Sequence, residues 1–184
     1  MREAIDVCQA LLEDEDLATA ADAVVDSIVT SISGGGKVLL CGNGGSAADA
    51  QHLAAELVGR FCLEREPFPA VALSDNIAAV TAVGNDYGYE EVFVRAVRAL
   101  GNAGDVLIGI STSGRSQNVV AALEVASERG LVTVALVGAA DTPMAAASDH
   151  LLRVTGPGTA RIQEGQMLLG HAIFELVERE LCDD

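Results

Sequence analysis

The sequence predicts an α/β fold in which helices cover a mostly parallel β-sheet. Short apolar runs at residues 37–41, 105–110 and 131–137 fit buried strands. Segments with apolar residues at helical spacing lie between these runs, and glycine-rich or polar turns separate the two kinds of segment. Strands that alternate with helices are typical of a parallel sheet, because each parallel connection needs a crossover. Such sheets bind ligands at the carboxyl ends of their strands.

Each element is predicted from its local pattern. The first 32 residues predict two helices with a break at residues 14–16. Ser46 is expected to cap the helix that it begins, since a serine hydroxyl can accept from the first free backbone N–H groups. Residues 85–88 are expected to form a turn. The remaining helices are predicted at 46–59, 76–83, 89–99, 119–129, 143–147 and 161–181, and the strands at 37–41, 69–73, 105–110, 131–137 and 150–154.

Length and composition indicate one soluble domain. The 184 residues are enough for a full core and show no linker or repeat, so residues 1–184 are expected to form a single domain with 1–32 as a helical segment. No apolar run reaches the roughly 18 residues that cross a bilayer, and the start lacks the pattern of a signal peptide. The four cysteines show no CxxC spacing and are expected to be reduced thiols. These features predict a cytoplasmic protein.

The formal net charge of −16 narrows the choice of partners. It argues against nucleic acid bound through a basic patch and against anionic membranes. Tryptophan is absent and other aromatic residues are few, so the sequence does not predict a surface on which nucleic-acid bases would stack. One local anion site can still work inside an acidic protein, so the charge leaves a phosphate ligand open.

The first candidate motif is the run Cys41-Gly42-Asn43-Gly44-Gly45-Ser46, where a strand should end and a helix begin. A glycine-rich turn there exposes backbone N–H groups at a helix start, which favours anions. The run also matches a loose dinucleotide fingerprint, Gly42-x-Gly44-x-x-Ala47, but Asp75 lies too far on to be its ribose-binding acid. A turn that serves only packing is the third reading.

The second candidate motif is the polar loop of residues 111–116, Ser-Thr-Ser-Gly-Arg-Ser, which follows an apolar strand and precedes a helix. Four hydroxyls and several free N–H groups at a helix N-terminus suit a phosphate monoester. The alternative is a simple N-cap with solvated neighbours. A Walker A lysine is missing, which argues against nucleotide hydrolysis.

The third and fourth candidates are residue pairs on helices. His52 and Glu56 lie four residues apart and so share one helix face, as an acid/base pair, a metal-binding pair or a surface pair. Gln163 and His171 lie about 80° apart around the axis of the last helix, near enough to flank one pocket. A buried His171 that bonds to a backbone carbonyl is the alternative for the second pair.

At these residues the chain resembles the sugar isomerase (SIS) domain family and, within it, the phosphoheptose isomerases. The resemblance covers nearly the whole chain and rests on long, correctly spaced motifs: Cys41–Arg60, Val83–Gly88, Gly104–Val119 and Arg161–His171. It implies a three-layer α/β/α fold with a five-stranded parallel sheet, and a homotetramer whose N-terminal helices take part in assembly. It also implies the conversion of sedoheptulose 7-phosphate to D-glycero-D-manno-heptose 7-phosphate. This is the first step toward nucleotide-activated heptose, which commonly enters the lipopolysaccharide core.

The resemblance also implies roles for individual residues. Glu56 would be the general base at carbon, and His171 would transfer protons at the oxygens of an enediol. Ser111, Thr112, Ser113 and Ser116 would hold the phosphate, and Asn43, Gly44, Gly45, Asn85 and Asp86 would contact the sugar, with Glu56 and Gln163 at the reacting end. His52, Glu56, Gln163 and His171 match residues that hold one zinc ion per subunit in some members.

Two related possibilities accompany this expectation. The replication-initiator-associating protein resembles an isomerase without its catalytic residues, and the presence of Glu56 and His171 argues against that reading. An isomerase for another sugar phosphate is the other alternative. The chain also departs from the family at Ala160, where many members carry aspartate.

Overall fold

The computed structural model describes residues 1–182, which form a five-stranded sheet in the order β2-β1-β3-β4-β5 with every neighbouring pair parallel. The described residues therefore confirm the predicted α/β class and make the sheet fully parallel. The last two residues of the expected single domain lie outside the described part. The strands are β1 (Val38–Gly42), β2 (Ala70–Ala72), β3 (Val106–Ser111), β4 (Val132–Val137) and β5 (His150–Arg153).

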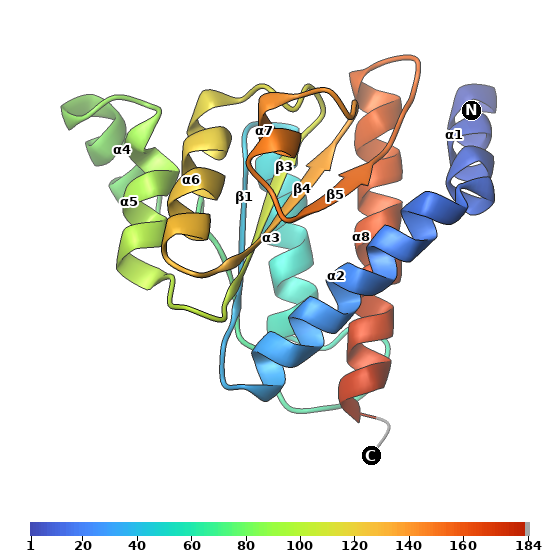
Figure 1. Ribbon diagram of the computed structural model, residues 1–184, viewed down its shortest axis with the longest axis horizontal. Helices are drawn as coiled ribbons and strands as arrows, with labels where there is room; N and C mark the ends of the chain where they lie inside the picture. Colours follow the sequence, from blue (N-terminus) through green and yellow to red (C-terminus); the bar gives the residue numbers. More distant parts are fainter. Residues whose placement is uncertain (183–184) are drawn as a thin grey trace.

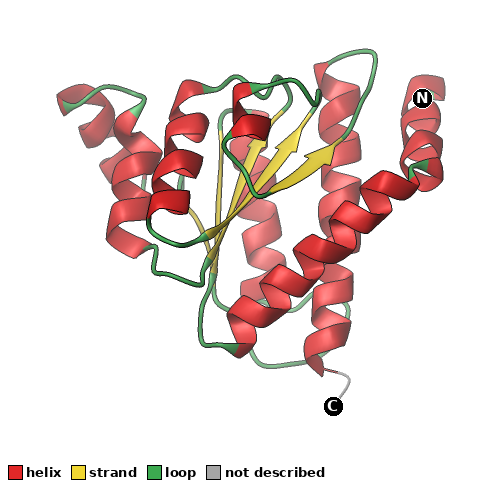
Figure 2. Cartoon of the chain, viewed as in Figure 1, coloured by secondary structure: helices red, strands yellow, loops and turns green. Residues whose placement is uncertain are grey.

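Helices cover both faces of the sheet and give the three-layer arrangement that the resemblance implies (Figures 1 and 2). One face packs against α1, α2, α3 and α8, and the other against α4 to α7. The helices are α1 (Arg2–Glu13), α2 (Glu15–Ser33), α3 (Gly45–Val58), α4 (Ile77–Asp86), α5 (Glu91–Leu100), α6 (Gln117–Glu128), α7 (Pro143–Ala146) and α8 (Thr159–Cys182).

The sheet is buried on both sides because its strands are almost wholly apolar. Alternate residues of β1 enter opposite cores: Val38 and Leu40 pack with α2, α3 and α8, whereas Leu39 and Cys41 pack with α5 and α6. Burial raises the pKa of the Cys41 thiol to about 12, so this cysteine is an inert core residue. A continuous apolar run is what a parallel strand covered on both faces requires.

Most helix ends differ from the predicted ones by one or two residues, and two differences concern residues singled out in the sequence. The cap of α3 is Gly44, with φ 57°, and not Ser46, which lies buried within the first turn. Asn85 and Asp86 belong to the last turn of α4 and not to a turn between helices. The predicted break at residues 14–16 is correct, because Asp14 Oδ1 accepts from Leu17 N at 2.9 Å and caps α2.

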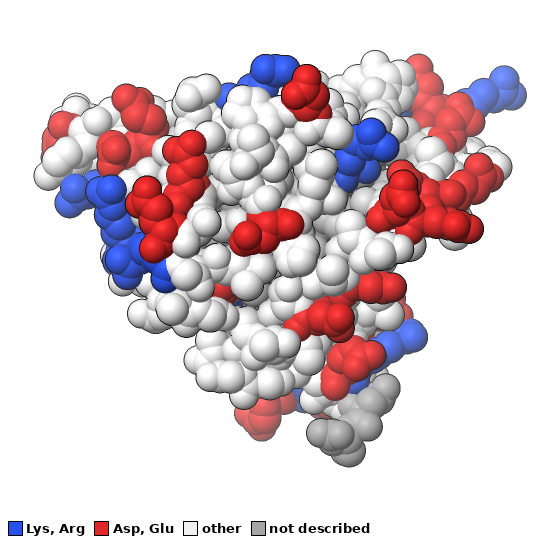
Figure 3. All heavy atoms as spheres, viewed as in Figure 1, with Lys and Arg blue, Asp and Glu red and all other residues white. Residues whose placement is uncertain are grey.

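Acidic side chains are spread over the face in Figure 3, and a dense group gathers where α1 meets α2, at Glu13 to Asp16. Within residues 1–182, no helix is both long and apolar enough to cross a membrane. The carboxyl ends of β1 and β3 lie side by side, since Gly42 pairs with Ile110. The two polar loops singled out in the sequence are therefore neighbours.

Candidate active site

A reciprocal amide pair joins the loop after β1 to the first turn of α6, which follows the loop after β3. Asn43 Nδ2 donates to Asn118 Oδ1 at 2.8 Å, and Asn118 Nδ2 donates to Asn43 Oδ1 at 2.9 Å. The Tyr89 hydroxyl donates to the same Asn43 Oδ1 at 2.9 Å. Both lone pairs of Asn43 Oδ1 are thus used, and one Nδ2–H remains free. Asn43 can therefore offer a ligand only a hydrogen-bond donor.

The close packing at the end of β1 explains why this turn contains glycine. A Cβ on Gly42 would lie 2.6 Å from the carbonyl oxygen of Ser46, so a larger residue would push the turn away from α3. Gly44 occupies the left-handed region with φ 57°. The turn holds the first N–H groups of α3 close to the end of the sheet, as an anion site requires.

The second loop has the geometry of a small anion cradle. Ser111 Oγ lies 3.0 Å from Ser116 Oγ and 3.3 Å from Ser113 Oγ, and Ser116 is the N-cap of α6. The backbone N–H of Arg115 points to Ser113 Oγ at 3.3 Å. These hydroxyls can exchange their mutual hydrogen bonds for bonds to phosphate oxygens at the positive end of the helix.

Two helices bring His52, Glu56 and His171 together. His52 Nε2 lies 2.9 Å from His171 Nε2 and 3.3 Å from Glu56 Oε1. His52 is exposed, while Glu56 and His171 are half-buried. Phe61 stacks on the His171 ring with 5.5 Å between centroids and 21° between planes. The predicted pair His52 and Glu56 therefore meets His171, one member of the second predicted pair, in one cluster.

This cluster fits a tetrahedral metal ion. One donor atom from each of the three side chains lies within 4.8 Å of the others. Four-coordinate zinc, with ligand distances of about 2.0–2.1 Å, separates its ligand atoms by about 3.3 Å. The separations of 2.9 and 3.3 Å come close to this value. Two imidazoles and a carboxylate are also a donor set that zinc accepts.

Gln163 lies on the first turns of α8, beside Gly45 and Asp49 of α3. Its side-chain amide fills the space beside Gly45, where a Cβ would collide with it. It also lies near Asp49. Burial raises the pKa of the Asp49 carboxyl above its ordinary value, and the neighbouring Gln163 and His52 offset part of this rise. Asp49, Gln163 and Ala160 line one open cleft between α3 and α8.

Asn85 and Asp86 lie at the exposed end of α4. Asn85 Nδ2 donates to Asp86 Oδ1 at 2.8 Å. Among residues 1–182, no hydrogen bond joins either of them to the other candidate residues. Their expected contact with the sugar therefore stays a prediction.

Sequence reasoning missed four residues that hold candidate site residues in place: Asn118 and Tyr89 at Asn43, and Phe61 and Glu178 at His171. Asn118 lies within the motif Gly104–Val119, but its contact with Asn43, 75 positions away, leaves no signal in the sequence. The other three lie outside the motifs and have partners that are distant in the sequence. Only Glu178 could have been found from the sequence, since it is a charged residue at a position of α8 that faces the core. A buried carboxylate needs polar partners, so its position predicts a contact of this kind.

Comparison with known proteins identifies the family of this chain. A family model described as "SIS domain" matches residues 1–138. A phosphoheptose isomerase of Burkholderia pseudomallei (strain 1710b) is 50% identical over 179 residues, which cover 97% of this chain and 91% of the relative. The solved phosphoheptose isomerase from Neisseria gonorrhoeae is 44% identical with a TM-score of 0.89, covering 96% of this chain and 94% of that one. The structure from Francisella tularensis is 35% identical with a TM-score of 0.91, covering 97% and 94%.

The match of the SIS domain model to residues 1–138, together with the five-stranded parallel sheet, places this chain in the SIS domain class. Within that class the chain belongs to the phosphoheptose isomerase family. Both levels of the resemblance drawn from the sequence motifs are thereby confirmed.

Proposed function

We propose that this protein converts sedoheptulose 7-phosphate to D-glycero-D-manno-heptose 7-phosphate, the first step of nucleotide-activated heptose biosynthesis. It is an aldose–ketose isomerase by its family. The observation that carries the proposal is the meeting of His52, Glu56 and His171 from two helices. We extend the proposal to a cytoplasmic enzyme whose product supplies the lipopolysaccharide core.

The phosphate is proposed to bind in the loop of residues 111–116. Hydroxyls and N–H groups at the start of α6 would surround its oxygens, with Ser111, Thr112, Ser113 and Ser116 as the side-chain donors. Binding energy from this remote group can be used to orient the reacting carbons. Asn43, Gly44, Gly45, Asn85 and Asp86 are the proposed contacts along the sugar chain.

Isomerisation moves one proton between adjacent carbons and shifts the carbonyl. Glu56 is the proposed base that removes the carbon-bound proton and returns it to the neighbouring carbon. His171 is the proposed acid and base at the two oxygens, so that the intermediate is an enediol. The stack with Phe61 holds the His171 ring beside His52 and within reach of Glu56.

Zinc is the proposed cofactor, one ion per subunit, held by His52, Glu56 and His171 with Gln163 as a fourth ligand. The two histidine nitrogens and the Glu56 oxygen support this assignment by their mutual distances. A bound zinc ion would polarise the substrate carbonyl.

The substitution Glu56→Gln tests the proposed base. It keeps the side-chain shape but removes the basic oxygen, so kcat should fall by about 10²- to 10⁴-fold. Steady-state kinetics with sedoheptulose 7-phosphate would measure the loss, and binding of inorganic phosphate should be unchanged. Retention of more than about a tenth of the activity contradicts the assignment, since a positioned base contributes more than that.

Assays of the native protein with several sugar phosphates separate the alternative functions. If the native protein turns over another sugar phosphate and not the heptose, the isomerase class stands and the substrate is wrong. If it turns over none and forms a stable complex with a protein partner, the scaffold reading replaces the enzyme.

A further inference from the structure

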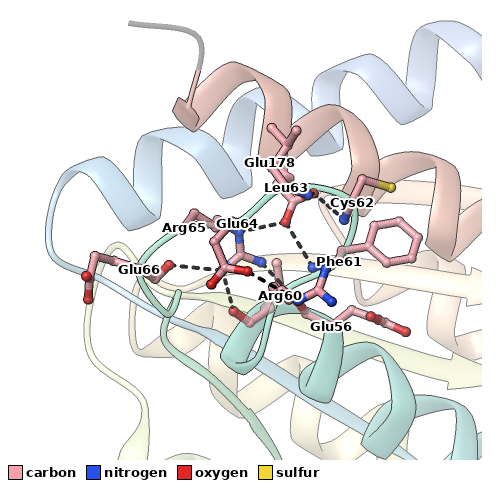
Figure 4. A network of polar contacts seen from close by, with 10 residues as sticks. Glu56, Arg60, Phe61, Cys62, Leu63, Glu64, Arg65, Glu66 and Glu178 are labelled. Carbon is pink, nitrogen blue, oxygen red and sulfur yellow. Dashed lines mark hydrogen bonds and ion pairs between the residues drawn. The ribbon is translucent and has the colours of Figure 1, made fainter.

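A buried carboxylate on α8 fixes the loop that follows α3. The Glu178 side chain has no exposed surface and accepts hydrogen bonds from three successive backbone N–H groups (Figure 4). These are the amides of Phe61 at 3.0 Å, Cys62 at 2.6 Å and Leu63 at 2.9 Å. Arg65 Nε donates to the same carboxylate at 2.8 Å. Four donors on one carboxylate give this loop little freedom to shift.

Arg65 extends this connection to the end of α3. Its side chain is 5% exposed, and its two terminal nitrogens each donate at 2.9 Å to a carbonyl oxygen of the last turns, those of Leu57 and Glu56. Such carbonyls lack partners within the helix. The ion pair between Arg65 and Glu178 thus links α3, which carries Glu56, to α8, which carries His171.

Phe61 connects the fixed loop to the candidate active site. Its backbone N–H is held by Glu178, and its ring stacks on the His171 imidazole at 5.5 Å and 21°. His52 approaches the same imidazole edge-on, with 5.1 Å between centroids. Phe61 and His52 therefore restrict the His171 ring from two directions.

We propose that Phe61 is a positioning residue for His171, and that the Glu178–Arg65 pair acts on catalysis by fixing the loop that carries Phe61. This inference rests on the proposed isomerase function. A buried ion pair adds little stability compared with apolar residues of the same size. It does supply directional bonds, which hold a loop in one place more narrowly than apolar packing does.

The first test replaces the ring. In Phe61→Ala, His171 loses its stacking partner, and misplacement of a catalytic group lowers kcat by about 10- to 100-fold. KM should change little, because the phosphate loop is untouched. Phe61→Tyr keeps the aromatic face and should restore most of the activity. Leu63→Ala is the matched control, because its amide also bonds to Glu178 while its side chain is 37% exposed.

A spectroscopic readout makes the test independent of turnover. The Phe61 ring current shifts the His171 imidazole protons in the metal-free native protein, and NMR at constant pH should show this shift lost in Phe61→Ala and kept in Leu63→Ala. Unchanged His171 signals in Phe61→Ala would overturn the stacking role, whatever the activity of the protein.

The second test addresses Glu178. In Glu178→Gln, the amides of residues 61–63 should exchange faster with deuterium, while the core strands stay protected. If Glu178 acts through Phe61, the double variant with Phe61→Ala should lose no more kcat than the worse single variant. If the kcat losses of the two single variants multiply in the double variant, Glu178 does not act through Phe61, and this part of the proposal is overturned.

If Glu178→Gln fails to fold, Arg65→Lys supplies the same test. It keeps the charge but loses the planar donors to the α3 carbonyls. Failure of the native protein to isomerise any sugar phosphate would refute the proposed function, whereas the amide exchange and imidazole signals would still decide whether the loop positions His171.

Discussion

At the scale of single residues, Asn43 is limited to one role by its neighbours. Tyr89 and Asn118 occupy both lone pairs of its amide oxygen, and one N–H is left for a ligand. A donor at this place suits an oxygen that gains negative charge during enediol formation. Asn43 is thus better suited to the substrate carbonyl than to a hydroxyl proton.

The substitution Asn43→Asp tests this role. A carboxylate cannot donate a hydrogen bond to the substrate. It would also lose the bond that Asn43 Nδ2 donates to the side-chain oxygen of Asn118, and the two oxygens would then repel each other. The loss of this half-buried donor is worth about 1–3 kcal/mol, so kcat/KM should fall by about 5- to 150-fold. Kinetics on Asn43→Asp would measure it, and Tyr89→Phe is the milder comparison because the Asn118 bond remains. Equal kcat/KM in Asn43→Asp and the native protein would contradict the donor role.

The residue scale also shows where sequence reasoning stops. His52 and Glu56 could be paired from their spacing, because the helix period fixes their direction. The contact between His171 and His52 joins residues 119 positions apart. The prediction that these two histidines share one site came from the family resemblance and not from the helical periodicity. Phe61 was missed because a single aromatic residue in a loop has no pattern that reveals its partner.

At the scale of elements, α3 and α8 form the candidate site together, and the absence of a side chain at Gly45 leaves room for the Gln163 amide. Ser46 was predicted to cap α3, and the structure places Gly44 there, because the turn needs a left-handed residue before the helix begins. Local propensity favoured serine, and tertiary packing decided otherwise. Asn85 and Asp86 were assigned to a turn for a similar reason, since asparagine and aspartate favour turns in the absence of other information.

Gly45→Ala tests the proposed fourth ligand. The new methyl group would displace the Gln163 amide, a flexible side chain that can move at little cost to the fold. We expect weaker zinc binding, by roughly 10-fold or more as for other disturbed ligand shells, and nearly unchanged thermal stability. Titration with zinc by calorimetry would measure the first quantity.

Gly158→Ala is the control for Gly45→Ala, since a Cβ there meets nothing within 4 Å. Zinc affinity in Gly45→Ala equal to that of this control would remove Gln163 from the ligand set.

The contact of α8 with the loop after α3 predicts a dependence of stability on pH. Burial alone would raise the pKa of Glu178, but the amides of residues 61–63 and Arg65 outweigh it, and the pKa lies below its ordinary value of 4.5. The ionised Glu178 carboxylate therefore makes its full contribution to the free energy of unfolding above pH 4.5, the ordinary pKa of the group. This contribution is lost as the pH falls through the lowered pKa of Glu178 in the folded protein.

Urea unfolding of the native protein and Glu178→Gln would measure this contribution. The difference in free energy of unfolding between them should be largest at neutral pH and should shrink in acid. A difference that stays constant with pH would show that the Glu178 charge does not contribute as described.

At the scale of the whole molecule, the fold could be predicted almost completely from the sequence. All five strands and the alternation with helices follow from apolar periodicity, because strands buried on both faces have continuous apolar runs. The strand order does not follow from periodicity, since it depends on which crossovers pack together. The predicted homotetramer and zinc ion stay proposals that the family resemblance supplies.

The surface of α4 predicts assembly. This helix is mainly apolar, yet none of its side chains, all of them described, is buried, and Ile77 is 71% exposed. An apolar patch of this kind marks an interaction surface. Light scattering should give the mass of a tetramer for the native protein and a smaller particle for Ile77→Glu. A monomeric native protein would contradict the expected assembly.

Glu56 and His171 are proposed to move a proton within a heptose phosphate bound at the loop of residues 111–116. The most direct test is a proton NMR time course with sedoheptulose 7-phosphate in deuterated buffer, first with zinc and then with a chelator. We expect an aldoheptose phosphate to form in the presence of zinc, with deuterium at C2 to the extent that the proton held by Glu56 exchanges with the solvent, and we expect the reaction to stop with the chelator. Absence of any aldose product in either condition would contradict this proposal.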